Sequence, residues 1–159
     1  MKKLLLLTAL AFSLISCEQN KQTQNGDWIK GSEVEKWKMV EEQFGGFGVM
    51  MKEVVYRYEE LYWAGKDQNW DYATHQLEEI QEAMEKGTIR RPERRETTIA
   101  FLDSALPTMH LAIQQKDTVL FSQNFERFRM ECISCHIKED HAYIRIITPT
   151  KKTSLVSFE

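Results

Sequence analysis

The feature that most constrains the fold is a set of four apolar stripes. Within residues 37–61, 70–84, 99–113 and 121–135, apolar side chains recur at alternating steps of three and four. This spacing places them on one face of an α-helix, because a helix turns once every 3.6 residues. No comparable strand pattern precedes residue 143. Because short connections make consecutive helices neighbours, the sequence predicts an all-α protein, an antiparallel up-down-up-down four-helix bundle.

Capping residues mark where these helices begin. Ser32 followed three positions later by Glu35 is a capping-box pattern, which predicts the start of the first helix. Asn69 and Asp117 have short side chains that accept hydrogen bonds from free backbone N–H groups, so they are good N-caps for the second and fourth helices. The third helix is expected to begin near Arg95. We therefore predict a bundle that starts at Ser32.

Glycines interrupt or follow the first two stripes. Gly65 and Gly87 come after the last apolar residues of their helices, and both are plausible stops. The glycines at 45, 46 and 48 interrupt the first stripe without changing its phase. Each costs a helix interior about 1 kcal/mol relative to alanine. They indicate either a break in the first helix or a place where a large group approaches the backbone.

The N-terminus has the pattern of an export signal. Two lysines precede an apolar run that is too short to span a bilayer comfortably, and small residues follow it. The last four residues of this segment, Leu14 to Cys17, resemble the bacterial lipobox. The resemblance implies cleavage after a signal peptide at 1–16 and a lipid on the Cys17 sulfur. The alternative is an ordinary signal peptide with an unrelated cysteine.

The rest of the chain divides by composition. Residues 17–31 are polar and predict a lipidated, flexible tether, 32–142 hold the bundle, and 143–159 predict an extended C-terminal tail. We expect an exported protein on the periplasmic or cell-surface side, anchored by its lipid to a bacterial membrane. Loss of Lys2 and Lys3 with the signal peptide moves the formal net charge from −3 to about −5. Such an acidic chain, without a basic stripe, is not expected to bind nucleic acid.

The fourth stripe ends in a C-x-x-C-H motif formed by Cys132, Cys135 and His136. Positions i, i+3 and i+4 share one face of a helix. Two thioethers from that face would bind a flat macrocycle while the adjacent imidazole reaches its iron, so the motif predicts covalent haem c with His136 as the proximal ligand. A catalytic dithiol would be expected in a βαβ setting, and a zinc site would need more ligands; neither is visible.

A late C-x-x-C-H on the last helix of a four-helix bundle resembles the class II c-type cytochromes, the cytochrome c-prime family, over about residues 33–140. The resemblance implies covalent haem, a proximal histidine and a sixth-side residue from the first helix. Some members have a methionine there and transfer electrons; others are five-coordinate and bind small gases. Members are often dimers, so a homodimer is possible. This chain departs from the family by continuing well past the motif.

Equal rises along antiparallel helices place residues 47–51 beside the motif. We therefore expect Met51, on the first apolar stripe, to be the distal iron ligand, with Met50, Met84 or a vacant site as alternatives. Methionine at such spacing is also common core filler. Three aromatic residues are expected to wall the haem or to be ordinary core: Phe44, Phe47 and Phe128.

The leading hypothesis is an electron carrier, not an enzyme, because no general acid–base pair is visible in the stripes. Its redox partner protein is not indicated. The alternatives are a five-coordinate gas-binding protein and a non-haem structural or interaction bundle on a lipid anchor. The arginines at 90, 91, 94 and 95 are expected either to hold haem propionates and acidic partners or to form a solvated loop. His75 and His141 are expected at the surface.

Overall fold

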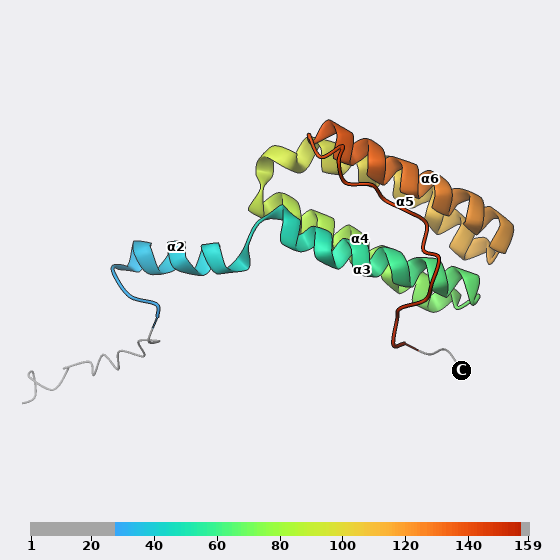
Figure 1. Cartoon of the computed structure of the whole chain (residues 1–159), viewed down its shortest axis with the longest axis horizontal. Coiled ribbons are helices and arrows are strands. Elements are labelled where there is room, and N and C mark those ends of the chain that lie inside the picture. The colour runs from blue at the N-terminus through green and yellow to red at the C-terminus, as the bar shows by residue number, and fades with distance from the viewer. Residues whose placement is uncertain (1–27, 157–159) are drawn as a thin grey trace, which may run out of the picture. The chain divides into compact units, whose positions relative to one another are not determined.

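The computed structural model describes residues 28–156 (Figure 1). These residues form α2 (Glu33–Phe44), α3 (Phe47–Lys66), α4 (Trp70–Arg90), the 3-10 turn η1 (Pro92–Arg94), α5 (Arg95–Gln115) and α6 (Thr118–Lys138). No strand occurs in this part of the chain, which confirms the all-α class. The predicted signal peptide and the predicted lipidation site, Cys17, lie outside the described residues. None of the described helices combines the length and apolar character needed to cross a bilayer.

The predicted first helix is two helices. Gly45 has a φ of 66°, in the left-handed region that favours glycine, and the helix breaks there. The chain divides into two compact units at this point, after Gln43. In the first unit the capping box is confirmed: the Ser32 N–H donates to Glu35 Oε2 at 2.7 Å, and the Glu35 N–H donates to Ser32 Oγ at 3.3 Å. No residue of α2 is buried. The prediction that one helix carries its apolar stripe from residue 37 to 61 into a core is therefore wrong.

The second unit contains four packed helices. α3 packs mainly along α4, α5 along α6, and α4 against α5. Both predicted N-caps are confirmed. The Asn69 side chain accepts from the Tyr72 N–H at 3.1 Å, and Asp117 accepts from two backbone N–H groups of the first turn of α6. The largest side chains of the core come from α6: Phe121, Phe125 and Phe128 are each 1% exposed.

Neither predicted stop glycine ends its helix. α3 continues past Gly65 to Lys66, and α4 continues past Gly87 to Arg90. Each glycine instead admits an aromatic ring. A Cβ on Gly65 would lie 2.1 Å from the Phe121 ring, and a Cβ on Gly87 would lie 2.8 Å from the Phe47 ring. These predictions were wrong because close packing, not chain termination, places glycine there.

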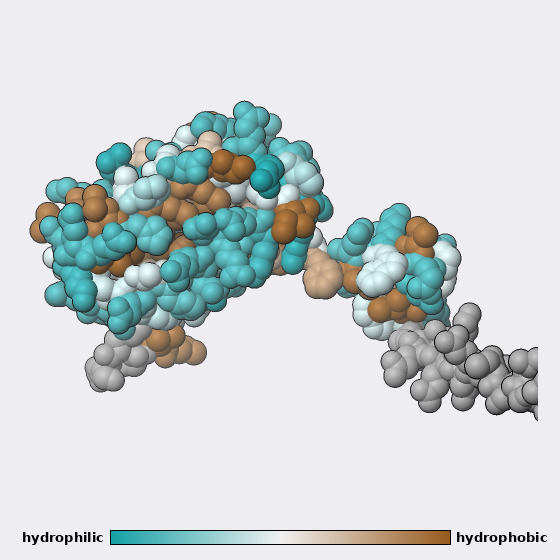
Figure 2. Space-filling model, turned by 180° about the vertical axis from the view of Figure 1, so that it is seen from behind, coloured by the Kyte–Doolittle hydropathy of each residue, from teal (hydrophilic) through white to brown (hydrophobic). Residues whose placement is uncertain are grey.

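The core is unevenly closed along the bundle. On α3 no residue before Tyr58 is buried, and on α6 none after Phe128 is buried. On α4 and α5, by contrast, burial continues to Thr88 and begins again at Thr98. Figure 2 shows apolar atoms visible in a strip along the bundle, between rows of polar side chains. The first half of α3 and the last turns of α6 are thus the least enclosed parts of the four packed helices.

The chain after α6 forms no helix or strand up to residue 156. It leaves the end of α6 and passes along α6 to α3 (Figure 1). The Tyr58 hydroxyl of α3 donates to the Ile147 carbonyl at 3.1 Å, and Arg129 of α6 donates to the Ile146 carbonyl at 3.0 Å. This segment is therefore bound to both helices by side chains that face the seam between them.

Candidate functional site

The three residues of the C-x-x-C-H motif lie on the last turns of α6. The helix continues to Lys138, so Cys132, Cys135 and His136 share one face, as the spacing predicts. Both cysteines are free thiols, and both pack against the hydrophobic core. All three side chains are half-buried. The end of α6 thus presents two sulfurs and an imidazole from one partly enclosed surface.

Burial keeps both thiols protonated. It raises the pKa of Cys132 to about 12, with a smaller contribution from the neighbouring Cys135 sulfur. Burial also raises the pKa of Cys135, followed by the negative charge of Glu139. Cysteines that act in redox exchange have lowered pKa values, since the thiolate is the nucleophile. The motif therefore lacks the electrostatic environment of a catalytic dithiol.

His136 is held neutral with an unused ring nitrogen. Its Nδ1 atom is buried and has no hydrogen-bond partner. Burial lowers the pKa of His136, while a hydrogen bond from the ring to the Ile144 backbone acts in the opposite direction. A neutral imidazole is the form in which histidine binds a metal. The residues present therefore fit a haem c group: two protonated thiols for thioether bonds and one neutral imidazole beside them.

An ion pair fixes which helix ends surround the motif. Arg94, at the end of η1, pairs with Glu139, one residue after α6. The same guanidinium lies 5.9 Å from the centroid of the Phe47 ring at the start of α3, and that ring fits against Gly87 of α4. The starts of α3 and α5 and the ends of α4 and α6 thus meet at one end of the bundle. Sequence reasoning did not find Glu139, because nothing local marks its partner.

The three candidate methionines occupy two different environments. Met50 and Met51 are half-buried on the second turn of α3, and Met51 packs against the core. Met84 is 3% exposed and lies inside the core cluster, which is the position of ordinary packing. Of the three methionines, only Met50 and Met51 both lie at the motif's end of the bundle and are partly exposed.

The three candidate aromatic residues also separate. Phe128 is buried in the core, where its ring meets Phe101 edge-on with centroids 5.4 Å apart. Phe47 is half-buried at the start of α3. Phe44 is 59% exposed, and the Arg90 guanidinium lies 5.5 Å from its ring centroid. Phe44 thus lies at the surface beside Arg90, outside the core that holds Phe128.

The remaining candidates have ordinary surface partners. Arg90 donates to the Phe44 carbonyl at 2.6 Å, and Arg91 donates to the Arg90 carbonyl at 2.7 Å. His75 is exposed, and its Nδ1 lies 4.0 Å from a Glu79 carboxylate oxygen, as expected of a surface residue. The arginines therefore do not act as one group: Arg90 and Arg91 bind backbone carbonyls, and Arg94 pairs with Glu139.

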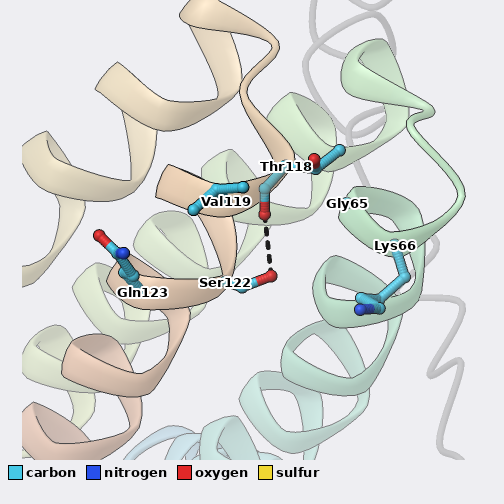
Figure 3. Close-up of a pocket in the computed structure, with 6 residues that line it drawn as sticks. All are labelled: Gly65, Lys66, Thr118, Val119, Ser122 and Gln123. Carbon is cyan, nitrogen blue, oxygen red and sulfur yellow. Dashed lines mark hydrogen bonds between the residues drawn. The ribbon is translucent and has the colours of Figure 1, made fainter.

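A shallow cavity of about 380 Å³ lies at the opposite end of the bundle (Figure 3). Its lining residues are Gly65, Lys66, Thr118, Val119, Ser122 and Gln123. The Ser122 hydroxyl donates to the Thr118 carbonyl within this lining at 2.8 Å, and neither a thiol nor an imidazole faces it. In residues 28–156 no group of three or more His, Cys, Asp or Glu side chains is arranged to hold a metal ion. The motif and this cavity are separate features.

Comparison with protein-family models, with curated proteins and with solved structures gave no match to this chain.

Proposed function

We propose that the protein is a membrane-anchored, monohaem c-type cytochrome that carries electrons. Cys132 and Cys135 form the thioethers, His136 is the proximal iron ligand and Met51 is the distal ligand. The observation that carries the proposal is the pairing of two half-buried, protonated thiols with a neutral imidazole that has an unpartnered nitrogen, all on one face of α6. The proposal takes the packed helices as an antiparallel up-down-up-down bundle resembling the class II cytochromes.

The local packing supports this assignment. A haem at the motif needs space against α3, and the first half of α3 and the end of α6 are the parts without buried residues. Phe47 and Phe128 would form apolar walls for the pocket. Gly87 lets the Phe47 ring approach α4 closely at this end of the bundle.

The chemistry follows from the side chains. Cys132 and Cys135 would hold the haem covalently through thioether bonds. The bound haem would supply one-electron exchange at its iron. His136 and the Met51 thioether would be the iron ligands, and methionine ligation raises the potential. The packed apolar side chains of the bundle would limit water at the site.

The N-terminal part of the proposal rests on sequence. The signal peptide 1–16 and Cys17 would export the chain and hold it to a bacterial membrane through lipid, with residues 17–31 as the tether. The partner would be a second redox protein that exchanges electrons at the motif's end of the bundle. The proposed function involves no nucleic acid and no making or breaking of bonds in a substrate. The suggestion of a homodimer rests on the family resemblance alone.

The test is expression of the full chain together with a cytochrome c maturation system. We expect haem that remains attached after denaturing electrophoresis and a six-coordinate, low-spin reduced spectrum. The double variant Cys132→Ala/Cys135→Ala should lose the attached haem. Cys17→Ala is the matched control, because it should keep the haem and lose only membrane association. Absence of attached haem in the unaltered chain would support a non-haem bundle. A high-spin ferrous spectrum that carbon monoxide shifts readily would support a gas-binding protein.

A further inference from the structure

The C-terminal segment closes a seam that the helices themselves leave open. Of the neighbouring helix pairs, α3 and α6 touch each other least. The segment from residue 144 to 153, called the strap below, runs along this seam (Figure 1). The Ile146 side chain packs against the hydrophobic core, like the core-facing residues of the helices. The strap thus supplies apolar contact where a direct α3–α6 contact is weak.

Hydrogen bonds hold the strap along its length. The Ile146 and Ile147 carbonyls accept from Arg129 and Tyr58, and the Thr148 hydroxyl donates to Glu126 at 3.1 Å. Further along, the Thr153 N–H and hydroxyl both donate to Glu59, at 3.0 and 2.6 Å. Anchors from α6 and α3 therefore alternate, and each hydrogen bond at or near the surface is individually weak. A segment bound by several weak anchors can detach without unfolding the helices.

The first half of the strap passes beside the motif. The His141 N–H donates to the His136 carbonyl at 2.7 Å, and the Ile144 N–H donates to the His141 carbonyl at 2.9 Å, so the chain enters the strap beside the motif. Arg129 is one helical turn before Cys132 and binds the next part of the strap. Tyr58, which belongs to the core cluster against which Cys132 packs, binds the residue after that. Two of the side chains that hold the strap, Arg129 on α6 and Tyr58 on α3, therefore lie in the same part of the bundle as Cys132.

We propose that the strap is a detachable cover over the α3–α6 seam that controls access to Cys132 and its neighbours in the motif. With the strap bound, the thiol is shielded; with it released, reagents and the haem group reach the motif from this side. The role in haem entry rests on the proposed function. The shielding of the Cys132 thiol does not, because it can be measured without haem.

The chain offers a matched pair of variants. Ile146→Asp places a carboxylate where the side chain packs on the core, so it should expel the strap. Ile147→Asp makes the same change at the next residue, whose side chain is 69% exposed, and leaves the carbonyl that Tyr58 binds. Both are made in the haem-free full chain carrying Cys17→Ser and Cys135→Ser, so that Cys132 is the single thiol.

The measurement is the rate at which Cys132 reacts with a maleimide, alongside amide hydrogen exchange of the strap. We expect Ile146→Asp to raise the labelling rate about tenfold or more, because local opening limits access to a half-buried thiol that packs against the core. Ile147→Asp should label at a rate close to that of the unaltered chain. If Ile146→Asp does not fold, the double variant Thr148→Val/Thr153→Val, which removes two anchors without adding charge, should give a smaller rise in the same direction. Equal labelling rates in a folded variant whose strap amides exchange freely would overturn the proposal.

A haem-attachment experiment distinguishes failure of the strap proposal from failure of the cytochrome proposal. In the chain with its cysteines intact, Ile146→Asp should accept haem from the maturation system at least as fast as Ile147→Asp. If thiol labelling behaves as expected but no chain acquires haem, the strap stands and the cytochrome assignment fails. If haem attaches normally and labelling is indifferent to Ile146→Asp, the cytochrome assignment stands and the strap fails.

Discussion

Gly65 provides a sharp test of how this bundle is packed. An alanine Cβ at this position would lie 2.1, 2.2 and 2.6 Å from three atoms of the Phe121 ring. Real Cβ atoms do not approach so closely, so the ring would have to move. Phe121 is 1% exposed, and its ring has Trp70 and Phe125 as neighbours, with centroids 6.0 Å away in each case. The ring is therefore buried between aromatic neighbours on α4 and α6, which oppose its displacement.

Two effects of opposite sign decide the outcome of Gly65→Ala. Alanine is favoured over glycine in a helix interior by about 1 kcal/mol, and by less near a helix end. Overpacking a closed core costs about 1–3 kcal/mol, and the three short distances place this site at the upper end. Because the packing effect is the larger, we expect Gly65→Ala to lower the free energy of unfolding by about 2 kcal/mol.

Urea unfolding of the full chain, followed by far-UV circular dichroism, measures this change directly. Gly48→Ala is the matched control, because it lies near the other end of α3 and a Cβ there would meet nothing within 4 Å. It should raise stability by a few tenths of a kcal/mol, up to about 1. If Gly65→Ala were as stable as the unaltered chain while Gly48→Ala behaved as expected, the close approach of Phe121 to α3 would be refuted.

Three further changes test other parts of the molecule. Asp117→Ala removes the acceptor for two N–H groups of α6 and should cost about 1 kcal/mol in the same urea assay; no loss would show that water replaces the cap. Burial and the hydrogen bond to Glu60 raise the pKa of Tyr72. Its contribution to stability is therefore complete below the ordinary tyrosine pKa of about 10 and is lost as pH rises above it; Tyr72→Phe should flatten that alkaline decline, and an unchanged slope would contradict this. In haem-loaded protein, Met51→Ala should convert the spectrum from six- to five-coordinate while Met50→Ala leaves it unchanged, and the reverse result would move the distal ligand to Met50.

Much of the secondary structure was predictable because its signals are local. Asn69, Asp117 and the Ser32–Glu35 pair act on backbone groups within three residues of themselves, and all three starts are confirmed. The start of α5 at Arg95 is confirmed as well. Glycine was misread at Gly65 and Gly87 because two different causes place glycine in a helix. One is the end of the helix, and the other is an aromatic ring on a neighbouring element, which the sequence around the glycine does not reveal.

The candidate site divides in the same way. That Cys132, Cys135 and His136 share a face follows from helical geometry, and the structure has them there. Their protonation does not follow from geometry alone, because it depends on how much of each group is buried. The sequence also could not predict that Phe44 lies at the surface and Phe128 in the core, since both continue an apolar stripe of correct spacing.

The sequence by itself determined where α2, α4, α5 and α6 begin, which residues cap α2, α4 and α6, and which residues of the motif share a helix face. These properties depend on neighbours three or four positions apart. Only the tertiary structure decided that the stripe of α2 stays unburied, that Arg94 reaches Glu139 and that the strap lies in the α3–α6 seam. The last of these rests on hydrogen bonds such as that between Thr153 and Glu59, which are 94 positions apart. No periodicity encodes such a pairing, because it exists only once the helices have packed and left a seam for the chain to fill.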